Sequence, residues 1–227
     1  MKINYIHKKY LKYNKGKAVI SSHIEALHAA PPAADLYTDK LVENIVDKIG
    51  CAGIIGTVSR KYADLNRSPS VENFEAIIEY RETIKDILQY LTILDNSSGE
   101  IVKPYLHLSI HGMKDAHYGP FAIEIGTLNG KSCSKEMKLW FERSITNGLK
   151  EYLPEVNVIF DRKFIGDRSI AYHRLGDGQE YEGYKDHFQT FQMEISFTLR
   201  KNYSEELVHL ISKIITDFQE EFIINCD

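Results

Sequence analysis

The chain alternates between short apolar runs rich in β-branched residues and longer segments whose apolar positions recur with helical spacing. The short runs predict strands over residues 17–22, 52–59, 105–110, 121–127, 156–160 and 190–197. The helical spacing predicts helices over residues 39–49, 71–94, 135–149 and 205–222. Because strands and helices alternate, we expect an α/β fold with three α/β/α layers around a mixed, largely parallel sheet.

Length and composition agree with one folded unit. The 227 residues suit a single α/β domain, which we expect to span residues 1–227. Hydrophobic residues make up 43% of the chain and charged residues 26%, so a proper core can form and disorder is not expected. The formal net charge of −4 argues against nucleic acid or an anionic membrane as a partner, because both require a basic surface.

The cysteines and the apolar runs indicate the cellular compartment of the protein. Cys51, Cys133 and Cys226 are odd in number and form no Cys-x-x-Cys pair, so a disulfide framework is not expected. Residues 1–17 lack the apolar core of a signal peptide, and no apolar run approaches the roughly 20 residues of a membrane helix. We therefore expect a soluble, cytoplasmic protein.

Two histidines come directly after predicted strands and are candidate metal ligands. His23 follows the first predicted strand, and His111 follows the third. Ligands gather at the carboxyl ends of strands in such folds, and a catalytic zinc takes about three nitrogen or oxygen ligands plus a water. Glu25, Asp35 and Asp39 are the available carboxylates; we favour Asp35, because the spacing of Glu25 to His23 is awkward for chelation and Asp39 belongs to the first helical turn.

The other histidines that the pattern singles out are interpreted as structural. These are His28, His107, His117, His173 and His187.

A short loop after the second predicted strand is a candidate substrate-binding segment. Arg60, Asn66 and Arg67 lie within residues 59–67, and arginine binds carboxylate oxygens two at a time. A solvated loop with an ion pair to Asp64 is the simpler alternative for this segment taken alone.

Glu194 is the candidate catalytic carboxylate. It shares one face of the predicted strand 190–197 with Gln192 and Ser196, whereas the other face is apolar. A strand with one wet face would show the same pattern. A carboxylate that faces a metal-activated water could instead take its proton.

The segment 126–132, Gly-Thr-Leu-Asn-Gly-Lys-Ser, approaches a phosphate-binding P-loop. That motif requires four residues between its glycines, and this segment has three. We interpret it as a turn at the rim of the site. A phosphate- or nucleotide-binding module that uses Gly126 to Ser132 remains the alternative from another functional class.

Taken in order, these pieces resemble the N-formylglutamate amidohydrolase family, over residues 18 to 200. The pieces are Ser22-His23, Asp35-Leu36-Tyr37-Thr38, Ser59-Arg60, Asp64-Leu65-Asn66-Arg67, Ile110-His111-Gly112-Met113, Ile125-Gly126-Thr127 with Gly130-Lys131-Ser132, and Phe191-Gln192-Met193-Glu194-Ile195. Two departures stand out. Ser109 replaces the aspartate expected two residues before His111, and residues 164–168 match only loosely.

The resemblance implies a fold, a cofactor and roles for particular residues. It implies a zinc-carboxypeptidase-like, phosphorylase/hydrolase-like architecture. It also implies that zinc (Zn2+) is held by His23, Asp35 and His111.

The same resemblance implies that Glu194 is the general base and then acid, and that Arg60 stabilises the oxyanion. Asn66 and Arg67 would hold a substrate carboxylate. The implied reaction is hydrolysis of the amide of a small N-acyl amino acid, such as N-formylglutamate to formate and glutamate. A metal-binding relative without catalysis is a further alternative, and the acyl group and the oligomeric state stay open.

Overall fold

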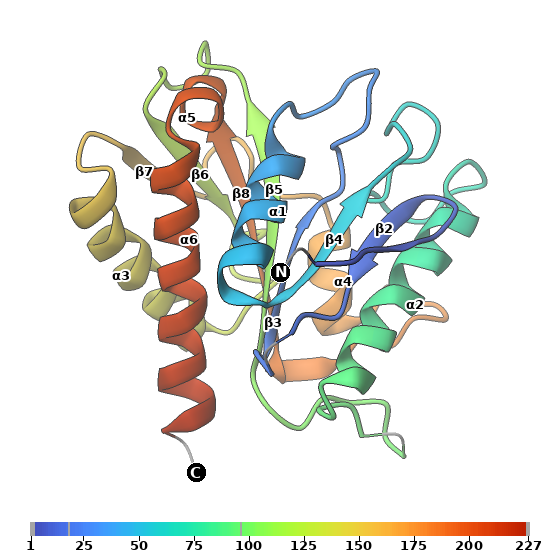
Figure 1. The fold of residues 1–227 in the computed structure, drawn as a ribbon. Coiled ribbons are helices and arrows are strands. Elements are labelled where there is room, and N and C mark those ends of the chain that lie inside the picture. Colours follow the sequence, from blue (N-terminus) through green and yellow to red (C-terminus); the bar gives the residue numbers. More distant parts are fainter. Residues whose placement is uncertain (1–2, 18, 96, 226–227) are drawn as a thin grey trace.

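The computed structural model describes residues 3–17, 19–95 and 97–225, so Cys226 and residue 18 of the first predicted strand lie outside the described residues. Eight strands form one sheet in the order β1-β2-β4-β3-β5-β8-β6-β7 (Figure 1). They are β1 (Ile6–His7), β2 (Leu11–Asn14), β3 (Ser22–Ala26), β4 (Ala52–Gly56), β5 (Tyr105–Met113), β6 (Ala122–Gly126), β7 (Asn157–Phe160) and β8 (Phe188–Ser196).

The sheet is mixed, as the alternation of elements predicts. Strands β4, β3, β5 and β8 run parallel to one another, and β6 and β7 form a parallel pair that is antiparallel to β8. Strands β1 and β2 pair antiparallel and extend the sheet beyond β4. The four central parallel strands therefore have their carboxyl ends at one edge of the sheet, where ligands bind in such folds.

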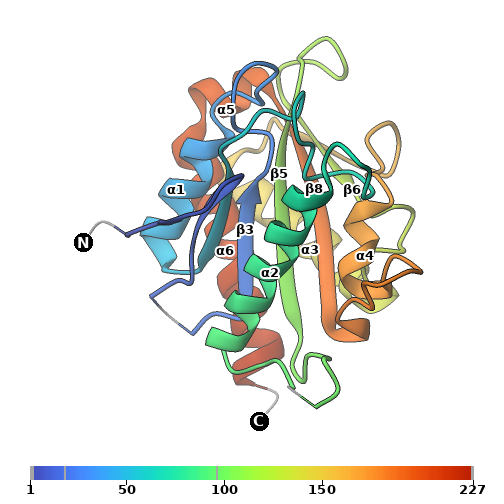
Figure 2. The same cartoon turned by 90° about the vertical axis from the view of Figure 1, so that its right-hand side faces the viewer.

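Helices cover both faces of this sheet and complete the three layers (Figures 1 and 2). They are α1 (Thr38–Ile49), α2 (Phe74–Tyr90), α3 (Lys135–Tyr152), α4 (Ser169–Leu175), α5 (Phe197–Asn202) and α6 (Ser204–Gln219), with a 3-10 turn at Lys185–His187 and a π turn at Glu220–Ile224. Helices α1, α3 and α6 lie on one face, and α2 and α4 lie on the other. The α/β/α architecture predicted from the sequence is confirmed.

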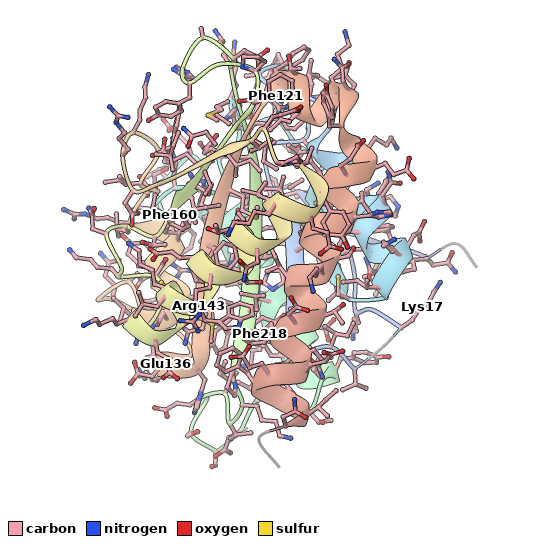
Figure 3. All side chains as sticks on the ribbon, turned by 90° about the vertical axis from the view of Figure 1, so that its left-hand side faces the viewer. Lys17, Phe121, Glu136, Arg143, Phe160 and Phe218 are labelled. Atoms are coloured by element: carbon pink, nitrogen blue, oxygen red, sulfur yellow. The ribbon has the colours of Figure 1, made fainter. Side chains whose placement is uncertain are left out.

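The face under α1, α3 and α6 is the apolar one. Leu106, Leu108 and Ile110 of β5 belong to its core, because alternate residues of a strand point to the same side. Phe218 of α6 (Figure 3) belongs to this core. It packs against Trp140 of α3 with 5.8 Å between ring centroids. Burial of these side chains holds the helices onto the sheet.

The opposite face of the same strands is polar along its middle, under α2 and α4. It carries His23 and Glu25 on β3, His107, Ser109 and His111 on β5, and Thr190, Gln192 and Glu194 on β8, all of them buried. Buried polar side chains cost free energy unless they are paired, so the side chains of this row need hydrogen-bond partners or a bound ligand.

Most predicted elements are present, but the first strand is displaced. The prediction placed it over residues 17–22, whereas β3 covers Ser22–Ala26. Val19, in the middle of the predicted strand, is 76% exposed. His23 therefore lies near the start of its strand, and the prediction that it follows a strand is wrong.

No helix among the described residues combines the length and the apolar character that crossing a membrane demands. Cys51 and Cys133 are free and buried.

Candidate metal centre and active site

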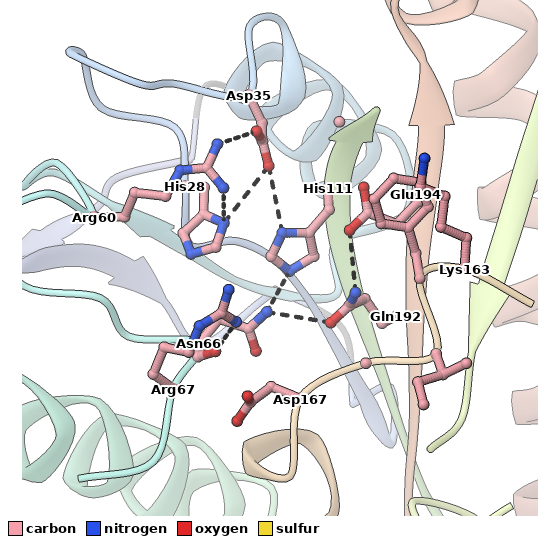
Figure 4. Close-up of a pocket in the computed structure, with 14 residues that line it drawn as sticks. His28, Asp35, Arg60, Asn66, Arg67, His111, Lys163, Asp167, Gln192 and Glu194 are labelled. Atoms are coloured by element: carbon pink, nitrogen blue, oxygen red, sulfur yellow. Dashed lines mark hydrogen bonds and ion pairs between the residues drawn. The ribbon is translucent and has the colours of Figure 1, made fainter. Parts of the chain in front are cut away.

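His28, Asp35 and His111 form a group, which we call the outer cluster, at the carboxyl edge of the sheet (Figure 4). His28 follows β3, Asp35 precedes α1, and His111 lies near the end of β5. Nδ1 of His111 stands 3.4 Å from Oδ2 of Asp35, and Nδ1 of His28 stands 3.6 Å from the same oxygen. Ligand atoms of a tetrahedral zinc stand about 3.3 Å apart, so the donor set fits this ion.

The Nε2 atom of each imidazole in the outer cluster has a polar partner that orients the ring. Nε2 of His28 lies 2.7 Å from Oδ1 of Asp64, and Nε2 of His111 lies 3.1 Å from Oγ of Ser109. Such partners determine which ring nitrogen stays available, and in both rings the nitrogen turned toward Asp35 is Nδ1. Ser109, the departure from the family pattern, thus contacts the histidine that the missing aspartate would support.

The prediction that His23 joins Asp35 and His111 is not what the structure shows. His23 belongs to a separate buried group with Glu25 and His107, which we call the inner cluster. The physical reason is the register of β3: the strand continues to Ala26, so the first histidine past its carboxyl end is His28.

The inner cluster also corrects the expectation for Glu25. Alternate residues of a strand share a face, and Oε2 of Glu25 lies 3.6 Å from Nε2 of His23. Burial and the nearby His107 lower the pKa of His23 to about 4, so its ring is neutral near pH 7. His107 and His23 stack with 4.2 Å between ring centroids.

Arg60 reaches into the outer cluster from the loop after β4. Its Nη2 donates to Oδ1 of Asp35 at 2.5 Å, and its Nη1 lies 2.8 Å from Nδ1 of His28. Burial alone would raise the pKa of Asp35, but His111, His28 and Arg60 together hold it well below the ordinary value.

The two candidate carboxylate binders differ in their surroundings. Asn66 is buried, and its Nδ2 lies 3.2 Å from Nε2 of His111 and donates to Oε1 of Gln192 at 3.2 Å. Arg67 has a side chain that is 53% exposed, with one Nη1 contact to the carbonyl of Asn66. Arg67 can therefore meet a ligand, whereas Asn66 supports His111.

Glu194 lies beside His111 across the sheet. The two residues are register partners on the parallel strands β5 and β8, so their side chains leave the same face. Gln192 donates to Oε1 of Glu194 at 3.1 Å. Burial raises the pKa of Glu194 above its ordinary value, although the positive charges of the site oppose this shift. The carboxylate is thus able to accept and return a proton beside the outer cluster.

A polar cavity of about 410 Å³ opens in front of these groups. Its lining comprises His28, Asp35, Arg60, Asn66, Arg67, His111, Gly112, Lys163, Phe164, Ile165, Gly166, Asp167, Gln192 and Glu194 (Figure 4). The far wall is the segment 163–167, which the buried carboxylate of Glu124 holds by accepting the backbone N–H groups of Arg162, Lys163 and Phe164. Small charged molecules suit a cavity of this size and polarity.

The glycine-rich segment 126–132 does not present its amides to a ligand. The carboxylate of Asp161 accepts the N–H groups of Thr127 and Asn129, and Oγ1 of Thr127 accepts that of Gly130. Leu128 donates its N–H to the carbonyl of Ile165, which links the segment to the cavity wall. Because protein acceptors use these donors, the segment supports the wall and leaves no cradle for a phosphate.

Sequence reasoning missed His28 as a site residue. The alternation of His23, Ile24, Glu25 and Ala26 is the signal that could have found it, because it places the strand later and Leu27-His28 at its end.

Comparisons with known proteins begin with two negative results. No protein-family model and no curated protein matches this sequence.

Solved structures do match, and they identify the fold. The crystal structure of N-formylglutamate amidohydrolase from Ralstonia eutropha JMP134 superposes with a TM-score of 0.67 at 13% identity, over 93% of this chain and 98% of that one. The chain shares the fold of N-formylglutamate amidohydrolase.

Two other structures extend this likeness. A bacteriophage poly-gamma-glutamate hydrolase matches with a TM-score of 0.53 at 13% identity, over 93% of this chain and 90% of that one. A metallo-carboxypeptidase from Burkholderia cenocepacia gives 0.51 at 12% identity, over 92% of this chain and 61% of that one. The carboxypeptidase-like fold implied by the sequence resemblance is confirmed.

Proposed function

We propose that this protein is a zinc-dependent hydrolase that cleaves the amide bond of an N-acyl amino acid, N-formylglutamate or a close analogue. The observation that carries the proposal is one polar cavity that joins the outer cluster, the carboxylate of Glu194 and the guanidinium groups of Arg60 and Arg67. Such a set contains metal ligands, a proton carrier and anion binders together.

His28, Asp35 and His111 would hold the zinc, with His28 in the place that the sequence prediction gave to His23. When bound, the zinc would supply a Lewis acid that polarises the substrate carbonyl and makes water more acidic. Two of the solved structures that share the fold are named for hydrolysis of N-formylglutamate and poly-gamma-glutamate, which favours a glutamate-containing substrate.

The chain's own residues would carry out the remaining steps. Glu194 removes a proton from the attacking water, and its raised pKa fits this exchange. Arg60 donates to the oxygen on which negative charge develops; one such donor is worth about 3 kcal/mol in other enzymes. Glu194 then passes its proton to the leaving amine. For N-formylglutamate, the C–N bond breaks, water adds across it, and formate and glutamate leave.

Arg67 would bind the substrate carboxylate at the mouth of the cavity. Its exposed guanidinium and its place in the lining support this role. We propose Asn66 as a positioning residue in this process, because its amide contacts His111.

A hydrolysis screen with zinc-loaded protein tests the proposal. N-formyl, N-acetyl and γ-glutamyl derivatives of several amino acids would be incubated with the protein, and the released amine would be measured. We expect turnover of at least one derivative with a free carboxylate, and loss of that turnover in His111→Ala. Full zinc occupancy without hydrolysis of any substrate would favour the non-catalytic alternative.

A further inference from the structure

The inner cluster has no part in the proposed reaction, and it is sealed inside the protein. The side chains of His23, Glu25 and His107 are 0%, 1% and 2% exposed. The helix α2 lies over the face of β3 and β5 that carries them (Figure 2). The hydroxyl of Tyr80 on this helix donates to Oε2 of Glu25 at 2.7 Å.

Both imidazoles of the inner cluster are oriented in the same manner. Nδ1 of His23 lies 2.9 Å from the hydroxyl of Tyr105, and Nδ1 of His107 lies 3.0 Å from the hydroxyl of Thr190. The hydroxyls account for one nitrogen of each ring, which leaves Nε2 of each ring on the side of Glu25. Metal-binding histidines show this arrangement, with the outward nitrogen bonded and the other turned to the ion.

Among the residues that the structure describes, neither of the two inward nitrogens has a hydrogen-bond partner. Nε2 of His23 is 3.6 Å from the carboxylate, and Nε2 of His107 is 2.9 Å from Oε1 of Glu25 but outside hydrogen-bonding geometry. An ordinary buried network would pair these atoms, because an unsatisfied buried polar atom costs about 1–3 kcal/mol. The separations bracket the roughly 3.3 Å between ligand atoms of a tetrahedral zinc.

The charge of the inner cluster also calls for a cation. Within residues 3–17, 19–95 and 97–225, the ion pairs of Glu25 are with His23 and His107, and no lysine or arginine pairs with it. A buried carboxylate is costly without a compensating positive charge.

We propose that His23, Glu25 and His107 bind a second, structural zinc ion inside the core. Two imidazoles and one carboxylate suit zinc, and the sealed surroundings leave no open position for a reacting molecule. The ion would enter as the chain folds, because the cluster does not reach solvent. His107 and His111 are four positions apart along β5, about 13 Å, so the two ions would not share ligands.

Zinc content of purified variants tests this second site. Wild type, His111→Ala, Glu25→Gln and the double variant would be folded in the presence of zinc, freed of loose metal by gel filtration, and analysed by mass spectrometry. We expect about two zinc ions per chain in wild type, about one in each single variant and none in the double variant. Tyr80→Phe is the matched control: it removes the hydrogen bond to Glu25 but no ligand, so it keeps both ions.

The result that overturns the inference is a wild type with a single zinc that His111→Ala loses and Glu25→Gln keeps. A single zinc with the reverse behaviour supports the inner site and removes the basis of the proposed function instead. If Glu25→Gln fails to fold, cobalt-loaded His111→Ala protein tests whether the inner site binds a metal. Strong visible absorption from cobalt bound to this variant supports the inner site, and its absence overturns it.

Discussion

The outer and inner clusters share two histidines and one carboxylate each, lie on the same face of one sheet, and differ in their surroundings. In the outer cluster His28 lies past the carboxyl end of β3 and His111 lies near that of β5, and the cluster borders a cavity of about 410 Å³. The inner cluster stands within these strands, under α2, with side chains at most 2% exposed. Position along a parallel strand, more than residue type, separates a site that can meet a substrate from one that cannot.

The side chains that contact the two clusters differ in charge. Charged groups surround the outer one, with Arg60 and Asp64 in contact with His28. Neutral hydroxyls surround the inner one, from Tyr105, Thr190 and Tyr80. The outer cluster therefore tolerates water and charged ligands, whereas the inner one favours a permanently enclosed ion.

Paired alanine variants of the two histidines near β3 should show the largest difference. His28→Ala removes a ligand of the outer cluster, and we expect hydrolysis to fall to background. His23→Ala should keep turnover within about tenfold but lower the free energy of unfolding by about 3 kcal/mol, because it removes one of the two buried histidines that pair with Glu25. Steady-state kinetics and urea unfolding check both; the opposite pattern would restore His23 as the catalytic ligand.

Glu194→Gln should come next in effect. Loss of a general base lowers kcat by about 10²- to 10⁴-fold, and we expect zinc content to stay unchanged because Glu194 is no ligand in the outer cluster.

The pH profile sharpens this prediction. The base acts when ionised, and burial raises its pKa, so the wild-type rate should fall as pH drops through a value above that of an ordinary glutamate. A variant that retains wild-type turnover would exclude Glu194 as the proton carrier.

Ser109→Ala tests how the outer cluster is supported. The hydroxyl lies 3.1 Å from Nε2 of His111, and loss of such a partner weakens metal binding by about 10- to 100-fold. Competition with a zinc chelator measures the effect, and Ser109→Thr, which keeps the hydroxyl, is the control. Equal affinity in the alanine variant would mean that Asn66 alone orients the ring.

Tyr80→Phe tests the inner cluster with the smallest change. It removes one hydrogen bond to a buried carboxylate, so we expect the free energy of unfolding to fall by about 1.5–3 kcal/mol. Turnover should stay at the wild-type level, since Tyr80 does not line the cavity in front of the outer cluster. A large loss of kcat would mean that the two clusters are coupled.

The spacing of apolar residues along the sequence was sufficient to predict the three layers of this fold. The spacing of apolar residues placed the helices that became α1, α2, α3 and α6, and the apolar runs placed β4 to β8 except for their ends. The sequence placed His111 at the end of a predicted strand, and the family resemblance assigned Glu194 to the same site. The structure makes the two residues register partners on β5 and β8.

The sequence by itself determined the polar residue types, the strand–helix alternation and the expectation of a metal held by histidine and carboxylate. Only the tertiary structure decided which histidines meet. The apolar run before His23 mimics a strand, but β3 forms from Ser22 to Ala26, where Ile24 and Ala26 pack into the core. A shift of four residues moves His23 from the edge into the interior and brings His28 to Asp35, because strand register depends on burial against neighbouring strands, which no local pattern contains.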